Sequence, residues 1–430
     1  MKKVLILSMA AITCCTTAHG QFGKLKEKIK DKVNERIDSK EDKEIDKGLD
    51  KTEEEIDDAG KPKAKGSASA KAGISEKSAQ EKQPSGSDGN SANGGATSAN
   101  ASIKAYNNYD FVPGDRIVFE DHFTDDQDGE FPSHWNLGAG QATLNKVAGN
   151  EALLLTNGNY AHVSPLVKAA TYLTDTFTIE FDSYTSGGYG PNIYLYNSTA
   201  EAKAASNNLA EVNICAGNIW EGVNVSATEG AIDLKGDYPT EIQGGKYANK
   251  WHHIAIAYRN HQLKVYVDQY RIITVPNLPV SPRAFDIEGI GDPGTPIIMA
   301  NFKVANGGNM NMYNKKFTDA KIVTHGINFD VDKFTIRPES MGTLNMIVKV
   351  LNDNPEIKFE VDGHTDNSGA AAHNLTLSQQ RADAVKAQLV TMGIDAGRLT
   401  AKGMGDTKPI NPNTTPEGKA NNRRVEFVKI

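Results

Sequence analysis

The sequence is poor in cysteine, in aromatic residues and in long apolar runs. It has three cysteines in 430 residues, and aromatic residues make up 7% of it. Cys14 and Cys15 lie in the N-terminal apolar stretch, so a chain without that stretch keeps only Cys215 and cannot form an intramolecular disulfide. Beyond residue 20 no run is long and apolar enough to predict a membrane-spanning helix.

Basic charge is scarce as well. The chain has 47 Lys and Arg against 54 Asp and Glu, which gives a formal net charge of −7. Loss of residues 1–20 would also remove Lys2 and Lys3 and bring the net charge to about −9. A chain this acidic has no electrostatic reason to bind phosphate backbones, so we expect no nucleic-acid partner.

Residues 1–20 have the pattern of a secretory signal peptide. Two lysines precede an apolar run, and small residues stand ahead of a cleavage point after Gly20. We therefore expect an exported protein of the cell envelope. Two alternatives are an uncleaved anchor helix and a lipoprotein with its lipid on Cys14 or Cys15, although the residues before these cysteines fit lipoprotein cleavage poorly.

Two polar segments follow. Residues 21–60 alternate charge sign along a thin apolar line formed by Phe22, Leu25, Ile29, Val33 and Ile37. This pattern predicts a charged helix, either a weak coiled coil or a solvated helix that frays. Residues 61–108 have almost no apolar content until their end, and we expect a disordered linker there because such a segment cannot offset its ordering entropy.

Residues 109–310 change to short strands that alternate apolar and polar residues. The stretches are 177–184, 192–197, 211–217, 251–259, 263–276 and 297–305, separated by turns rich in Gly, Pro and Asn. Many antiparallel strands with one buried side predict a β-sandwich. The alternative is an outer-membrane β-barrel, which the charges throughout 251–269 disfavour.

The motif "FEDHF" at 119–123, Trp135, the stretch 251–272 and "NFKV" at 301–304 resemble concanavalin A-like and laminin-G-like jelly rolls. The resemblance implies glycan binding, sometimes with a structural calcium, for which Asp121 is a weak candidate ligand. It also raises the possibility of a glycan hydrolase with Glu180 and Asp182 as its carboxylates, but the third acid expected after "IEFDSY" is absent. We interpret this pair as surface-facing.

From residue 322 to residue 430 strands alternate with helices. The predicted strands are 322–332, 356–363 and 398–405, the predicted helices are 338–355 and 375–392, and 416–430 forms a helical turn and a closing strand. This order predicts a compact α/β domain with a mixed sheet. The whole chain is therefore expected to be multidomain, with an N-terminal helix and linker, an all-β domain and an α/β domain.

Arg381 occupies an unusual position in the second of these helices. Leu377, Val385 and Leu389 form an apolar stripe, and Arg381 stands four residues from two of them. The nearest carboxylate in sequence is Asp366, in the loop before the helix. Either the two residues pair with each other and fix the loop, or they hold the two charges of a zwitterionic ligand.

The motifs "GHTDNSG" (363–369), "NLTLSQQRA" (374–382) and "NRR" (422–424) resemble the OmpA-like peptidoglycan-binding domain over about 322–430. The resemblance implies that Asp366 and Arg381 hold the zwitterionic end of meso-diaminopimelate. The other positions that match the family's pocket are Asn374, Leu375, Thr365, Phe329 and Arg424. We expect the side chain of Arg423 to leave the strand on the opposite side from Arg424, as a surface charge.

These expectations describe a non-enzymatic envelope protein without a cofactor. Its C-terminal domain binds the diaminopimelate of peptidoglycan, and its β-sandwich carries a glycan-binding or protein-binding surface close to the wall. Two alternatives stay open, a wall-docked glycan hydrolase and a membrane barrel anchored to the wall.

Overall fold

The computed structural model describes residues 105–156, 160–217, 220–289, 296–307 and 320–430. The chain divides into a unit of residues 1–87 and a compact unit of residues 88–430, and all described residues belong to the second. The predictions for 1–20, for 21–60 and for most of the linker lie outside the described residues. Within the described part, every helix is too short or too polar to cross a membrane.

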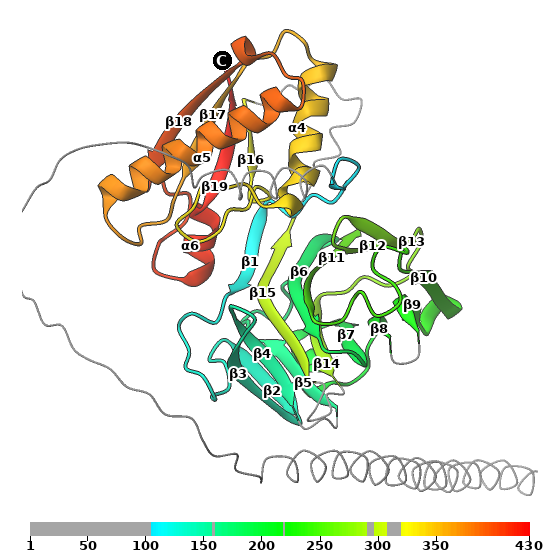
Figure 1. The fold of residues 1–430 in the computed structure, drawn as a ribbon. Coiled ribbons are helices and arrows are strands. Elements are labelled where there is room, and N and C mark those ends of the chain that lie inside the picture. The colour runs from blue at the N-terminus through cyan, green and yellow to red at the C-terminus, as the bar shows by residue number, and fades with distance from the viewer. Residues whose placement is uncertain (1–104, 157–159, 218–219, 290–295, 308–319) are drawn as a thin grey trace, which may run out of the picture. The chain divides into compact units, whose positions relative to one another are not determined.

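Two antiparallel sheets, together named the two-sheet domain, follow the first described residues (Figure 1). The eight-stranded sheet contains β1 (Arg116–Asp121), β3 (Gln141–Val147), β4 (Asn150–Thr156), β6 (Thr176–Thr185), β11 (Lys250–Arg259), β12 (Gln262–Val267), β13 (Tyr270–Val275) and β15 (Ile297–Asn306). Its order is β13-β12-β11-β6-β15-β4-β3, and β1 pairs with β15. The predicted strand 263–276 is thus two strands, because Asp268 (φ 51°) turns the chain between them.

The seven-stranded sheet has the order β10-β9-β8-β7-β14-β5-β2. Its strands are β2 (Trp135–Ala139), β5 (Ala161–Pro165), β7 (Tyr189–Tyr196), β8 (Ala210–Ala216), β9 (Glu221–Ala227), β10 (Ile232–Asp237) and β14 (Ala284–Gly289). A short helix, α3 (Thr199–Ala204), follows β7, and a single turn, η1 (Glu229–Ala231), precedes β10. Apolar side chains of both sheets form one hydrophobic core, so the two sheets pack face to face.

Strand β6 is buried on both of its sides. Phe177, Ile179 and Phe181 point into the common core. Glu180 and Asp182 alternate with them on the other side, yet they are only 2% and 6% exposed. The prediction of a surface-facing acidic pair is therefore wrong, because this side of the eight-stranded sheet is covered by the last third of the described chain.

The C-terminal module, residues 320–430, has a four-stranded sheet of order β16-β19-β17-β18 (Figure 1). Its elements are β16 (Lys321–Thr324), η2 (Pro338–Ser340), α4 (Met341–Asp353), β17 (Phe359–His364), α5 (Ala371–Thr391), η3 (Ala396–Arg398), β18 (Leu399–Gly405), α6 (Pro416–Asn422) and β19 (Arg424–Lys429). Strands β17 and β18 are parallel and the other pairs are antiparallel, which confirms the mixed sheet. The predicted strand 322–332 is shorter than expected, since β16 ends at Thr324.

Two glycines let α5 lie close against β17 and β18. A Cβ atom on Gly363 would stand 2.4 Å from the carbonyl oxygen of Ser378, and one on Gly403 would stand 2.5 Å from the amide nitrogen of Gln379. Larger residues at these positions would push the helix away from the sheet. The close approach fixes the start of α5 beside the loop that follows β17.

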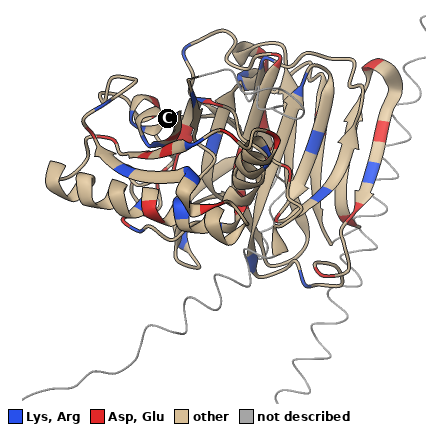
Figure 2. Ribbon diagram, turned by 90° about the horizontal axis from the view of Figure 1, so that it is seen from above, with Lys and Arg blue, Asp and Glu red and all other residues tan. Residues whose placement is uncertain are grey.

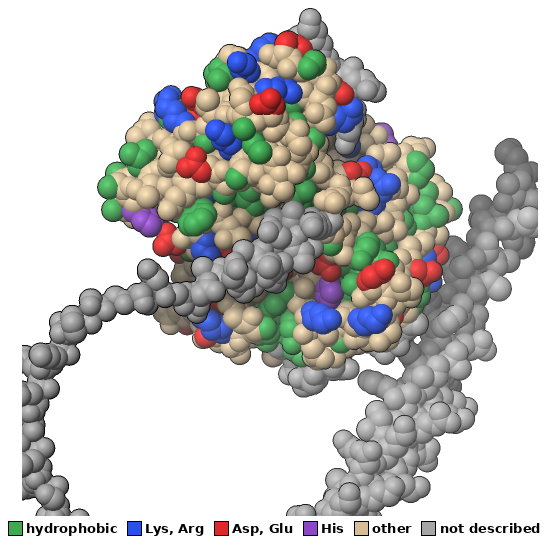
Figure 3. Space-filling view, turned by 45° about the horizontal axis from the view of Figure 1, so that its top comes forward, with side chains coloured by type: hydrophobic (Ala, Val, Ile, Leu, Met, Phe, Trp, Pro, Cys, Tyr) green, Lys and Arg blue, Asp and Glu red, His purple; other side chains and the backbone are tan. Residues whose placement is uncertain are grey.

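The segment before β1 belongs to the core of the module. Tyr109 and Phe111 are almost fully buried and share a hydrophobic cluster with α4, α5 and β17. Tyr266, from β12 of the two-sheet domain, lies in the same cluster. Acidic and basic residues are interspersed along the ribbon (Figure 2), and on the face drawn in Figure 3 apolar side chains lie in small groups between polar ones.

Candidate functional site

The loop between β17 and α5 carries the first candidate, Asp366. The Oδ1 atom of Asp366 accepts a hydrogen bond of 2.7 Å from the backbone N–H of Ser368. The Asn374 amide closes the loop from the first turn of α5, because its Nδ2 donates to the carbonyls of Asp366 (3.3 Å) and Ser368 (3.0 Å). Asn374 therefore orients the loop that presents the Asp366 carboxylate.

Arg381 lies at the edge of the apolar stripe of α5 and is half-buried. Its Nε donates to the Lys333 carbonyl at 2.9 Å, and its Nη2 donates to the Asp330 carbonyl at 3.4 Å. The guanidinium carbon is 4.9 Å from the centre of the Phe329 ring, which is cation–π geometry. The chain accepts an arginine here because an aromatic face and two carbonyls replace the lost water.

Arg423 is the residue that contacts Asp366. Its Nη1 lies 2.6 Å from the Oδ2 of Asp366, and its Nη2 pairs with Glu120 at the end of β1. Arg423 is therefore partly exposed, as a surface charge would be, but it is held by two carboxylates and is not free in solvent. A direct Asp366–Arg381 pair, one of the two alternatives from the sequence, does not form, because Asp366 takes Arg423 as its partner and Arg381 takes backbone carbonyls.

Arg424 has its partners elsewhere in the module. Its Nε is 2.7 Å from Glu426 Oε1, and its two Nη atoms donate to the carbonyls of Asn422 and Lys408. It is only 5% exposed. These contacts join Lys408 to the end of α6, so the arginine that contacts Asp366 is Arg423, which the sequence pattern did not identify as a site residue.

The charges at this site shift one another's pKa. Burial raises the pKa of Asp366, but hydrogen bonds from Arg423 and from the N–H of Ser368 outweigh burial and hold it below its ordinary value. Burial and the nearby Arg423 lower the pKa of Arg381, while Asp366 opposes them. Asp366 is therefore an anion at neutral pH, within electrostatic reach of two cations.

The other predicted residues lie around this loop. Thr365 is 6% exposed, and within the described part of the chain its Oγ1 has no hydrogen-bond partner. Leu375 is 50% exposed on the first turn of α5, and the ring of Phe329 lies against the Arg381 guanidinium. The structure thus brings together Thr365, Asp366, Asn374, Leu375, Phe329 and Arg381, and it adds Arg423 and Glu120.

The weak calcium candidate, Asp121, has a different role. Its Oδ1 accepts from the N–H of Phe123 at 2.8 Å, and its Oδ2 accepts from Trp135 Nε1 at 2.9 Å. Both oxygens of Asp121 thus accept hydrogen bonds from N–H groups. The structure gives no support to Asp121, the one residue proposed from the sequence, as a calcium ligand. Among the described residues no group of three or more His, Cys, Asp and Glu side chains is placed to hold a metal ion.

Glu180 and Asp182 lie in a network of charges. His253 Nδ1 is 2.9 Å from Asp182 Oδ1, and its Nε2 is 3.5 Å from Glu180 Oε2. Lys303 lies 3.5 Å from Glu180, and Arg337 of the module lies 3.7 Å from Asp182. Burial raises the pKa of each carboxyl, but these cations outweigh it and lower both, so both are ionised at neutral pH.

The C-terminal module is similar in sequence to known proteins. Residues 328–423 match a family model described as the OmpA family. The probable lipoprotein YiaD of Escherichia coli (strain K12) is 43% identical over 104 residues, which are 24% of this chain and 48% of that protein. The peptidoglycan-binding protein ArfA of Mycobacterium tuberculosis (strain ATCC 25618 / H37Rv) is 39% identical over 107 residues, 25% of this chain and 33% of that one. The chain thus spans about half of the first relative and a third of the second.

The two-sheet domain has a weaker match among solved structures. The carbohydrate-binding module CBM66 from Bacillus subtilis covers 40% of this chain and 95% of its own length, with 14% identity and a TM-score of 0.29. A similarity at this level carries no argument about a ligand.

Proposed function

Because residues 328–423 are an OmpA family domain, we propose that this protein binds peptidoglycan non-covalently through the meso-diaminopimelate of the stem peptide. In this proposal the protein is exported and stays on the periplasmic side of the outer membrane, held to the wall by its C-terminal module. The two-sheet domain, a concanavalin A-like jelly roll in this proposal, binds a glycan or an envelope protein there. One relative of the module carries the name peptidoglycan-binding protein.

The observation that carries the proposal is a pair of opposite charges, Asp366 in the loop before α5 and Arg381 in the middle of α5. Asp366 is an anion that the loop and Asn374 hold in place. Arg381 uses two of its five N–H donors on backbone carbonyls, which leaves three for a ligand. An ammonium on Asp366 and a carboxylate on Arg381 would make charge-assisted hydrogen bonds at both ends of one amino-acid centre.

Arg423 would have to move partly away from Asp366 when a ligand ammonium binds there. It covers Asp366, which is only 7% exposed, so it must give up part of its contact when a ligand binds. Glu120 offers the same guanidinium a second carboxylate. Arg423 therefore keeps a partner while Asp366 accepts the ligand, which lowers the cost of opening the site.

The same geometry predicts selectivity between stem peptides. Diaminopimelate ends in an ammonium and a carboxylate on one carbon, whereas lysine at the same position has only the ammonium. Without the carboxylate, Arg381 would be left with a repulsive cation close by and no anion to compensate it. We expect the module to discriminate against lysine-containing walls.

The charge network supports a non-enzymatic role for the two-sheet domain. Glycoside hydrolysis by two carboxyls needs one of them protonated at working pH. Nearby cations lower the pKa of both Glu180 and Asp182, so neither holds that proton. This favours wall tethering over the alternative of a wall-docked hydrolase.

The proposal is tested by sedimentation of the purified protein with isolated cell-wall sacculi. We expect co-sedimentation with sacculi that contain diaminopimelate, release by free meso-diaminopimelate, and little sedimentation with sacculi that contain lysine. Equal sedimentation with both kinds of sacculi would refute recognition through the zwitterionic end.

A further inference from the structure

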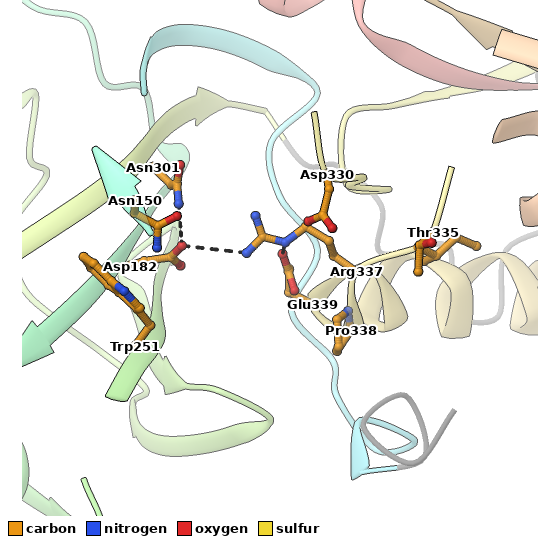
Figure 4. Close-up of a pocket in the computed structure, with 10 residues that line it drawn as sticks. Asn150, Asp182, Trp251, Asn301, Asp330, Thr335, Arg337, Pro338 and Glu339 are labelled. Carbon is orange, nitrogen blue, oxygen red and sulfur yellow. Dashed lines mark hydrogen bonds and ion pairs between the residues drawn. The ribbon is translucent and has the colours of Figure 1, made fainter. Parts of the chain in front are cut away.

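A cavity of about 340 Å³ lies between the eight-stranded sheet and residues 330–339 of the module (Figure 4). The sheet contributes Asn150, Asp182, Trp251 and Asn301, from four different strands. Its volume is at the lower end of the range for small-molecule sites. The cavity is therefore large enough for one small polar molecule.

Asn301 is held in this wall by an unusual backbone. It lies at an irregularity in β15, where the register with β6 shifts, and its φ is 54°. A residue other than glycine is strained in this region of backbone conformation. The Asn301 amide donates to Asp182 Oδ2 at 2.8 Å, and its Oδ1 lies 3.0 Å from His122 Nδ1. The irregularity in β15 thus places the polar side chain of Asn301 in the cavity wall.

Trp251 adds an aromatic surface and a donor. Its ring packs against Tyr184 with ring centres 5.4 Å apart. Its indole N–H is buried, and among the described residues it has no hydrogen-bond partner. A buried donor without a partner costs free energy unless a ligand or water accepts from it.

The charges that line the cavity already compensate one another. Asp182 faces His253 at 2.9 Å and Arg337 at 3.7 Å, and Arg337 Nε is 2.5 Å from Glu339 Oε1. A charged ligand would have to break one of these pairs. A neutral ligand with many hydroxyls meets fixed donors and acceptors, and the C–H face of a sugar ring suits the plane of an indole.

The cavity shares a chain segment with the peptide site. Asp330 lines the cavity, and the carbonyls of Asp330 and Lys333 accept hydrogen bonds from Arg381. The segment 330–337 therefore contacts Arg381 through two backbone carbonyls and also lines the cavity, through Asp330 and residues 335–337. Sugar and peptide sites that share one wall suit a ligand in which a sugar carries a peptide.

We propose that this cavity binds one neutral sugar unit of the glycan strand, so that the module and the two-sheet domain together hold both parts of a peptidoglycan fragment. Sugar binding rests on the cavity, and the identity of the glycan rests on the proposed function.

The test is calorimetric titration of the whole protein with N,N′-diacetylchitobiose, a neutral amino-sugar dimer, and separately with meso-diaminopimelate. We expect saturable binding of the sugar that is about tenfold weaker in Trp251→Ala, which removes the aromatic wall, and in Asn301→Gly, which removes the amide that holds Asp182 in the cavity wall. Asn301→Gly relieves the positive φ, so this variant keeps the fold while losing the amide. Binding of diaminopimelate should be unchanged in both variants.

The outcomes separate the two proposals. If the protein binds diaminopimelate but shows no saturable binding of the sugar, or if both variants bind the sugar as well as the parent does, the cavity proposal is wrong and the peptide site stands. If neither ligand binds, both proposals are wrong.

Discussion

At the scale of single residues, buried charges in this protein are shared rather than paired one to one. Arg423 serves Asp366 and Glu120, and His253 serves Asp182 and Glu180. A shared cation holds two carboxylates that would otherwise repel each other. Loss of its charge therefore weakens the compensation of two anions at once.

His253 gives a prediction about pH. Burial lowers its pKa, but the hydrogen bond to Asp182 and the nearby Glu180 carboxylate outweigh burial and raise it to about 10. Because the folded pKa is above the ordinary value, the stabilisation is complete below about pH 6.5 and is lost as pH rises through about 10. Between pH 7 and 9 the free energy of unfolding should fall with a slope approaching about 1.4 kcal/mol per pH unit from this group.

The measurement is urea unfolding at several pH values for the parent and for His253→Gln. We expect the variant to be less stable at pH 7 and to lose that part of the slope. Parallel stability curves for the two proteins would show that His253 is not protonated in the folded state.

At the scale of elements, helix α4 packs directly on the backbone of the segment before β1. Asn345 of α4 donates to the carbonyls of Tyr106, Asn107 and Tyr109. A Cβ atom on Gly342 would stand 1.7 Å from the carbonyl oxygen of Phe111. This contact requires a residue without a Cβ atom, so glycine stands here although it is a poor helix former.

Gly342→Ala should therefore destabilise the protein, although alanine is the better helix former. The gain of about 1 kcal/mol in propensity is outweighed by overpacking against Phe111, and we expect a net loss of about 2 kcal/mol in the free energy of unfolding. The exposed Asn352→Ala on the same helix is the control, with an expected change within about 0.5 kcal/mol. Increased stability of Gly342→Ala in denaturant unfolding would mean that the segment does not pack on α4.

Strand β1 is linked to the Asp366 loop through Arg423, which pairs with both Glu120 and Asp366. In Glu120→Gln the guanidinium has only Asp366 as a charged partner, so it competes more strongly with an incoming ammonium. We expect binding of meso-diaminopimelate about fivefold weaker, a size typical of one partly exposed ion pair. Glu130→Gln removes the same charge from an exposed position and serves as the control. Equal affinity of the two variants in calorimetry would show that β1 does not influence the site.

The sequence predicts elements better than it predicts partners. Alternation in "FTIEFDSY" predicts β6, and the apolar spacing of Leu377, Val385 and Leu389 predicts α5, because these patterns are local. That Glu180 is buried and that Arg423 meets Glu120 depends on which surface covers another, and Glu120 is 303 residues from Arg423. Local periodicity contains no information on such contacts. Strands such as β10, which is mostly exposed at a sheet edge, lack the alternation that would reveal them.

At the scale of the whole molecule, contacts join the two-sheet domain to the module at several points. Asn421 of α6 exchanges two hydrogen bonds with the backbone of Ile117 in β1, at 3.0 and 2.8 Å. Tyr266 of β12 lies in the hydrophobic cluster of the module. Polar and apolar contacts of this kind resist independent motion of the two parts.

We therefore expect residues 105–430 to unfold in a single transition. Calorimetric scans of the purified protein should show one peak, with equal calorimetric and van't Hoff enthalpies. Two separated peaks, one of which shifts alone on addition of meso-diaminopimelate, would show that the two parts fold independently.

The central claim is that Asp366 and Arg381 together hold a zwitterion. Its most direct test is calorimetric titration of meso-diaminopimelate into the purified protein and into Asp366→Asn, Arg381→Gln and the exposed control Asp383→Asn. We expect saturable binding by the parent and the control, and a loss of about 2 kcal/mol or more in each of the first two variants, because each leaves one end of the ligand without its partner. Binding by either of these variants as tight as that of the control would contradict it.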